Sequence, residues 1–221
     1  MAPKAPAEPG QKKLADDKRA ALALTSVGSE AERRLDMLVD LLLTWQRTIN
    51  LVAPSTLGRV WTRHVADSLQ LIAHAPAARV WVDLGSGAGF PGLAVACALP
   101  AGSEVHLVES DSRKAAFLRE AARITGAPAH VHKMRIEDFS SDRRVDLVTA
   151  RALAPMARLL DYAAPFLEKG AQGLFLKGQD VEAELTEAAK SWHMEAELVA
   201  SITEPRSRIV RIRALNPLRI R

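Results

Sequence analysis

The chain has 221 residues, of which 48% are hydrophobic, so it is long enough to bury one good core. Its single cysteine, Cys97, excludes an internal disulfide framework and is typical of a reducing compartment. No apolar stretch has the length of a secretion signal or a membrane span, so we expect a cytoplasmic protein. The net charge of +4 favours polyanionic partners.

The N-terminal third is expected to contain a tail and a helical cap. Residues 1–25 mix proline, alanine, lysine and aspartate without a sustained apolar period, which predicts a mobile tail. Residues 26–76 carry apolar residues at helical spacing and predict a cap of two helices. Ser29 and Glu32 have the spacing of a capping box at the start of the first helix. We expect this cap to lie over the carboxyl edge of the following sheet, where the parallel strands end.

From residue 77 to residue 221, short apolar segments alternate with helical ones, which predicts one α/β domain. The pattern favours a mostly parallel seven-stranded sheet with helices on both faces and an antiparallel pair at its end. The expected strands cover about residues 80–84, 104–108, 129–132, 144–150, 173–178, 195–203 and 208–215. The expected helices include one that begins at Asp111 or Ser112 and closes at Gly126, one over about 155–168 and one over about 180–192.

Four glycines follow the first expected strand within eight residues, from Gly85 to Gly92. Glycines permit a sharp turn and let a ligand lie against the main chain, where any Cβ would obstruct it. Free N–H groups at the start of the next helix attract a polar or anionic group. The spacing Gly87-x-Gly89-x-x-Gly92 also fits dinucleotide sites, so the glycines alone do not select a cofactor.

Other polar residues are expected at the same carboxyl edge. Glu109 ends the second strand about 20 residues beyond the glycine turn, where an acid accepts hydrogen bonds from both hydroxyls of a ribose. Ile136, Glu137, Arg151 and Lys177 follow the third, fourth and fifth strands. Turn capping for Glu137, a surface ion pair for Arg151 and solvation for Lys177 are the structural alternatives. Together with the glycine turn, Glu109 predicts a nucleoside-cofactor site.

The C-terminal stretch from Arg206 to Arg221 contains six arginines and no acidic residue. This pattern is typical of a surface that binds polyanions, and we hypothesise that Arg206, Arg208, Arg211 and Arg213 bind RNA phosphates. A solvated basic face is the alternative.

The six histidines do not predict a metal site. His130 and His132 lie on one strand face, but no acidic residue completes a ligand set with them. His64 stands beside Arg63 on the second cap helix, and a packing histidine that pairs with Asp67 is its default interpretation.

Short motifs between residues 30 and 215 occur together in a fixed order. They are Trp45-x-x-x-x-Asn50-Leu51, Arg63-His64-x-x-Asp67-Ser68, Asp83-Leu84-Gly85-Ser86-Gly87-Ala88-Gly89-Phe90-Pro91-Gly92, Arg113-Lys114-x-x-Phe117-Leu118, Arg135-Ile136-Glu137, Ala150-Arg151-Ala152 and Lys177-Gly178. In this combination the chain resembles the bacterial small-subunit ribosomal RNA guanine-N7 methyltransferases, the glucose-inhibited division protein B family. Two departures are the long Ala/Pro/Lys tail and Val52, where relatives commonly carry threonine.

The resemblance implies a class I methyltransferase with a Rossmann-like sheet, which transfers a methyl group from S-adenosylmethionine to N7 of a guanosine in 16S ribosomal RNA. We therefore expect a monomer whose partner is small-subunit ribosomal RNA or the assembling small subunit. By position, the implied cofactor residues are Gly85, Gly87, Phe90, Glu109, Ile136, Glu137 and Arg151. The resemblance places Asn50, Lys177 and Arg206 or Arg208 on the RNA-facing side, and His64, Arg211 and Arg213 are further candidates for RNA binding. No residue is a certain catalyst, and Asn50, Arg151 and Lys177 are candidates for positioning.

The residues after the fourth strand agree with this chemistry. Enzymes that methylate an exocyclic amine usually carry Asn/Asp-Pro-Pro-Tyr/Phe there, whereas this chain has Thr149-Ala150-Arg151-Ala152. Guanine N7 offers a free lone pair, so its methylation needs no general base. An NAD-dependent oxidoreductase and a non-catalytic nucleotide- or RNA-binding protein are the alternative functions.

Overall fold

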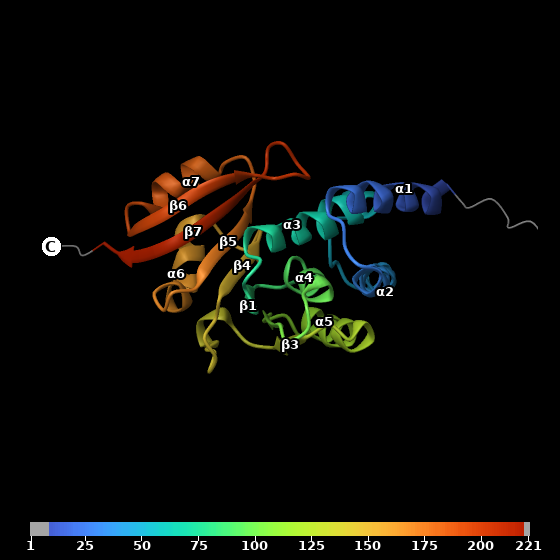
Figure 1. The fold of residues 1–221 in the computed structure, drawn as a ribbon, viewed down its shortest axis with the longest axis horizontal. Coiled ribbons are helices and arrows are strands. Elements are labelled where there is room, and N and C mark those ends of the chain that lie inside the picture. Colours follow the sequence, from blue (N-terminus) through green and yellow to red (C-terminus); the bar gives the residue numbers. More distant parts are fainter. Residues whose placement is uncertain (1–8, 219–221) are drawn as a thin grey trace, which may run out of the picture.

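The computed structural model describes residues 9–218, and at its centre lies a seven-stranded sheet in the order β3-β2-β1-β4-β5-β7-β6 (Figure 1). The strands are β1 (Val80–Leu84), β2 (Glu104–Val108), β3 (Ala129–His132), β4 (Leu147–Arg151), β5 (Gln172–Lys177), β6 (Trp192–Ala200) and β7 (Arg208–Pro217). The first five strands are parallel, and β7 runs antiparallel to both β5 and β6. The predicted α/β sheet with an antiparallel end is therefore confirmed.

Some boundaries differ from the prediction. Strand β4 begins at Leu147 and not at residue 144. Just before it, the Asp146 carboxylate accepts hydrogen bonds from the backbone N–H groups of Arg79 and Val80 at 2.8 and 3.0 Å. Strand β6 begins at Trp192, inside the segment that was expected to be helical.

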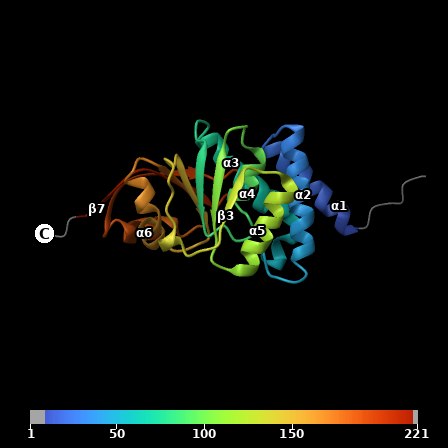
Figure 2. The same cartoon turned by 90° about the horizontal axis from the view of Figure 1, so that it is seen from below.

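Helices cover both faces of the sheet (Figures 1 and 2). On one face lie α4 (Gly92–Ala98) and α5 (Ser112–Thr125), and on the other lie α6 (Met156–Leu167) and α7 (Val181–Ala188). Alternate strand residues supply two cores. Trp81 and Leu107 pack with α5, whereas Val82 and Val148 pack with α6. As predicted, Asp111 caps α5 by accepting from two backbone N–H groups, and Gly126 closes it in a left-handed conformation.

The N-terminal helices pack beside α4 and α5. They are α2 (Ser29–Trp45), a 3-10 turn η1 (Pro54–Arg59), a π-helical turn η2 (Trp61–Ala66) and α3 (Asp67–His74). The segment between α2 and η2 reaches the carboxyl edge of the sheet, whereas α2 and α3 themselves pack against α4 and α5. The predicted capping box is wrong: α2 is preceded by Gly28 and has no side-chain cap, and Ser29 is already helical. The division of the chain at residue 76 stays a prediction.

The predicted tail is wrong for most of its length, because α1 (Pro9–Leu24) is a helix that packs on η1 and η2. Residues 1–8 lie outside the described part of the chain. Asp17 accepts hydrogen bonds from the backbone N–H and the hydroxyl of residues at the start of η2, and Lys18 forms ion pairs with Glu32 and Asp36 of α2. These contacts join segments that are distant in sequence, so no local pattern of apolar residues predicts them. Within residues 9–218, no helix is both long and apolar enough to cross a bilayer.

Candidate active site

A cavity of about 760 Å³ opens at the carboxyl edge of β1, β2 and β4. All the residues predicted for the cofactor line it: Gly85, Gly87, Phe90, Glu109, Ile136, Glu137 and Arg151. His64 also lines it, together with residues that the sequence analysis did not select, namely Leu51, Thr56, Arg63, Lys114, Leu153, Arg158 and Tyr162. Of these, Leu51, Arg63 and Lys114 stand within the quoted motifs, and that was the signal in the sequence that could have selected them.

The glycine turn is fixed by a buried carboxyl group. Asp83 ends β1 with no exposed surface, and it accepts hydrogen bonds from Thr149 Oγ1 at 2.8 Å and from the Gly92 backbone N–H at 3.2 Å. A Cβ at Gly92 would lie 2.6 Å from the Asp83 carboxylate, so only glycine allows this approach. Burial raises the pKa of Asp83 to about 6, against the opposing effect of its hydrogen bonds.

Glu109 stands in the cavity wall with its carboxylate already oriented. One oxygen accepts a hydrogen bond from the Gly87 backbone N–H at 2.9 Å, and the other accepts one from the Asp111 backbone N–H at 2.7 Å. Each oxygen retains a lone pair for a further donor. The group can therefore accept hydrogen bonds from a diol without first being ordered.

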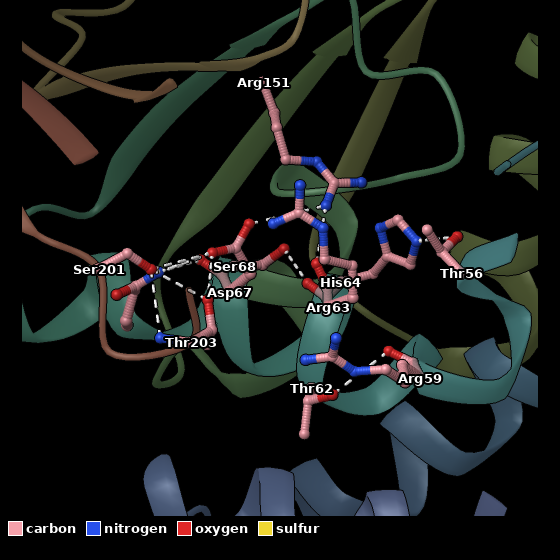
Figure 3. A network of polar contacts seen from close by, with 11 residues as sticks. Thr56, Arg59, Thr62, Arg63, His64, Asp67, Ser68, Arg151, Ser201 and Thr203 are labelled. Carbon is pink, nitrogen blue, oxygen red and sulfur yellow. Dashed lines mark hydrogen bonds and ion pairs between the residues drawn. The ribbon is translucent and has the colours of Figure 1, made fainter. Parts of the chain in front are cut away.

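Arg151 is half-buried at the end of β4, where its guanidinium lies 5.3 Å from the centroid of the Phe90 ring. It donates a hydrogen bond to the Arg63 carbonyl at 3.2 Å and faces the Asp67 carboxylate at 3.8 Å (Figure 3). Burial lowers the pKa of Arg151, and the Asp67 carboxylate opposes this effect. The predicted surface alternative for Arg151 does not apply.

His64 packs against the opposite wall, with its ring stacked on Phe90 at 5.2 Å between centroids. Its Nε2 is hydrogen-bonded to Thr56 Oγ1 at 2.8 Å, so the predicted pairing with Asp67 is wrong (Figure 3). Its Nδ1 is buried and has no hydrogen-bond partner within residues 9–218. Burial and the charges of Arg151 and Arg63 lower the pKa of His64 to about 3, so the imidazole is neutral at physiological pH.

Asp67 instead connects the N-terminal helices to the turn between β6 and β7. Its carboxylate accepts hydrogen bonds from Thr203 Oγ1 at 2.7 Å and from Gln70 Nε2 at 2.9 Å, and Ser201 Oγ lies 3.4 Å away (Figure 3). Ser201 and Thr203 are more than 130 residues distant from Asp67 in sequence. Sequence reasoning missed this role because the turn bears no motif.

Lys177 and Asn50 lie outside this cavity. Lys177 is buried at the end of β5, where its Nζ donates a hydrogen bond to the Ala154 carbonyl at 2.8 Å and pairs with Glu184 of α7. Glu184 also accepts from the Met156 N–H, so Lys177 helps to fix the loop after β4. Asn50 is exposed, and the cavity wall is formed by the residues that follow it.

The arginines predicted to bind RNA fall into two groups. Arg211 and Arg213 form ion pairs with Glu197 of β6 at 3.1 and 2.8 Å. Arg208 donates hydrogen bonds to two nearby carbonyls, and Arg206 is exposed and has no ion-pair partner within residues 9–218. The stretch from Arg206 onward contains no acidic residue in sequence. In the fold, however, the neighbouring strand β6 supplies the carboxylate that pairs with Arg211 and Arg213.

Comparisons with known proteins identify the family of this chain. The family described as GidB, rRNA small subunit methyltransferase G, matches residues 31–211. A ribosomal RNA small subunit methyltransferase G from Nitrobacter winogradskyi is 59% identical and aligns with 88% of this chain and 72% of its own. One from Bradyrhizobium sp. (strain BTAi1) is 58% identical, with 91% and 92% covered.

Solved structures agree on the fold. The O-methyltransferase TomG from Streptomyces achromogenes, in complex with SAM, has a TM-score of 0.58 at 11% identity, over 94% of this chain and 100% of its own. An O-methyltransferase from Bacillus cereus, in complex with SAH, has a TM-score of 0.56 at 13% identity, over 92% and 99%. At such identities these likenesses concern the fold alone. The family match and the close relatives decide the identity: this chain belongs to the rRNA small subunit methyltransferase G family.

Proposed function

We propose that this protein transfers the methyl group of S-adenosylmethionine to N7 of a guanosine in small-subunit (16S) ribosomal RNA. The observation that carries the proposal is the cavity in which Glu109, held by two backbone N–H groups, adjoins the glycine turn in a member of this family. The bound cofactor would supply an electrophilic methyl group on a sulfonium.

The residues present fit that cofactor. In this proposal Glu109 accepts hydrogen bonds from the ribose hydroxyls, and Ile136 and Glu137 border the adenine from the 3-10 turn after β3. Gly85 and Gly87 turn the backbone close to the methionine portion, with φ of 67° and 55°. Phe90, whose ring adjoins both His64 and Arg151, forms an apolar wall beside it.

The acceptor chemistry needs little from acid–base groups. N7 would contribute its own lone pair to the new bond with the methyl carbon, and the electrons of the broken bond would remain with the cofactor, so no residue has to accept or donate a proton. The neutral His64, with its pKa lowered to about 3, and the cationic Arg151 are consistent with a site that has no general base. Positioning of the two reactants is then the main contribution, worth roughly 7–11 kcal/mol in favourable cases.

The proposal also covers the compartment, the oligomeric state and the residues that contact RNA. Ribosomal RNA as substrate implies the cytoplasm, and we propose a monomer as the working unit. We retain Arg206 and Arg208 as phosphate contacts because neither forms an ion pair within residues 9–218, and we retain Asn50 as an exposed positioning candidate beside the cavity.

The test is transfer of labelled methyl from S-adenosylmethionine to small subunits from a strain that lacks this enzyme, with nucleoside analysis. We expect N7-methylguanosine with the wild type. Glu109→Gln and Glu109→Ala should weaken cofactor binding by roughly 10- to 100-fold, as loss of hydrogen bonds to a charged group does. Glu120→Ala, at an exposed acid on α5, is the matched control. Cofactor binding without transfer would favour a non-catalytic RNA-binding protein, and no cofactor binding would refute the proposal.

A further inference from the structure

A second cavity of about 250 Å³ adjoins the first. The two share Arg63, Arg151 and Ala152, which form the wall between them. Ala152 adopts a φ of 50°, which is costly for a residue with a Cβ, and such conformations cluster at sites that bind ligands. The shared wall is thus a feature of the site and not an accident of surface shape.

The position of the second cavity follows from the order of the strands. Glu109 and Ile136 lie beyond β2 and β3, on one side of the glycine turn, and Arg151 lies beyond β4 on the other. The second cavity continues past Arg151 to Lys177 at the end of β5. It therefore lies on the side of Arg151 away from the proposed ribose site. Because methyl transfer requires the acceptor to approach opposite the leaving sulfur, this is the side where an acceptor has access.

The charges around the cavity single out one residue. Arg151 faces Asp67, and Lys177 pairs with Glu184 and donates to a carbonyl. Arg63 is half-buried, lines both cavities and has no carboxylate within 4.0 Å among residues 9–218. Its backbone is nonetheless fixed, because its carbonyl accepts from Arg151 (Figure 3). Arg63 is a positioned cation whose donors remain available.

We propose that the second cavity receives the acceptor guanosine and that Arg63 donates hydrogen bonds to one of its oxygen atoms, either O6 of the base or the 5′-phosphate. This inference rests on the proposed function and adds the acceptor subsite to it. Arginine has only donors, and both oxygens are the acceptors that it binds best in nucleic acids. A contact to either oxygen leaves the N7 lone pair free to attack.

The test compares Arg63→Ala and Arg63→Lys with Arg59→Ala, a change at an exposed arginine on η1 that lines neither cavity. Methyl transfer to unmodified small subunits and cofactor binding are measured separately. We expect Arg63→Ala to lower kcat/KM for the subunit by roughly 10- to 100-fold while the Kd for S-adenosylmethionine stays within about twofold. Arg63→Lys should recover part of the loss, and Arg59→Ala should behave as the wild type.

Modified substrates identify the oxygen. After the methylated position is mapped, subunits are reconstituted with 2-aminopurine riboside there, which lacks O6 but keeps N7, or with a methylphosphonate in place of its 5′-phosphate. If Arg63 contacts the altered oxygen, Arg63→Ala adds no further loss on that substrate. Coupling to either oxygen supports the inference. Full additivity on both substrates, or a weakened cofactor Kd in Arg63→Ala, would overturn it. Wild-type transfer in the same assay keeps this failure distinct from failure of the proposed function.

Discussion

At the scale of single residues, the buried carboxyl of Asp83 joins three parts of the site. It contacts Thr149 on β4 and the start of α4 at Gly92, and it ends the strand that leads into the glycine turn. An ionised group with no solvent exposure is costly even when hydrogen-bonded, and this is why its pKa is raised to about 6. Ionised Asp83 therefore holds the turn in place but lowers the unfolding free energy of the protein at neutral pH.

This destabilisation is measurable as a dependence of the unfolding free energy on pH. The folded state holds the Asp83 proton more tightly than the unfolded state, so its stabilising contribution is present below about pH 4 and is lost as the pH rises to about 6. Asp83→Asn can keep both hydrogen bonds without ionising. We expect the unfolding free energy of the wild type, relative to Asp83→Asn, to fall by on the order of 2–3 kcal/mol over that range. Urea denaturation at several pH values measures it, and a constant difference would contradict the raised pKa.

Strand-end residues were the most predictable part of the site. The order of strands decides which loops meet at the carboxyl edge, so Glu109, Glu137 and Arg151 could be placed from the sequence. Contacts between distant segments could not be placed in this way. The pairing of Thr56 with His64 and of Asp67 with Thr203 depends on packing that no local pattern encodes.

At the scale of elements, α1 and η2 act together. Asp17 of α1 satisfies the free backbone N–H groups of Trp61 and Thr62 at the start of η2, and η2 carries Arg63 and His64 into the cavity. Helix α1 was missed from the sequence because its charged residues suit a solvated tail equally well. Their partners, in η2 and α2, become neighbours only in the folded chain.

Removal of this contact should weaken both folding and RNA methylation. Asp17→Ala leaves helix N–H groups without an acceptor, and we expect a loss of about 1–2 kcal/mol in unfolding free energy. Because η2 carries Arg63, kcat/KM for the small subunit should fall more than cofactor affinity does. Asp16→Ala removes an exposed neighbour whose only side-chain partner in the described part of the chain is Arg19, and it serves as the control. Equal stability of the two variants would contradict the role of Asp17.

At the scale of the whole molecule, the positive charge is distributed less simply than the net value of +4 suggests. The arginines of β7 face the glutamates of β6 across an antiparallel pair, with Glu197 opposite Arg211. By contrast, the turn at Arg206 and the cavity at Arg63 present cations that form no ion pair within residues 9–218. RNA should therefore meet the molecule along the carboxyl edge and the β6–β7 turn.

The salt dependence of RNA binding distinguishes these surfaces. Each phosphate contact contributes about 0.7–0.9 to the slope of log K against log salt. Arg206→Ala should reduce the slope by one such contribution, whereas Arg213→Ala should reduce it less, because Glu195 and Glu197 already pair with that side chain. Filter binding to small-subunit RNA at several salt concentrations measures both. If Arg213→Ala reduced the slope as much as Arg206→Ala does, Arg213 would have to leave its ion pair with Glu197 and bind an RNA phosphate.

The bonds from Asp67 to the β6–β7 turn also have a consequence for the order in which the protein is completed. Asp67 is synthesised 136 residues before Thr203, its partner. Until the β6–β7 turn has been synthesised, the chain lacks the segment that holds Asp67, which in turn faces Arg151. We therefore expect the Arg151 side of the cavity to be completed only after Thr203 has been made.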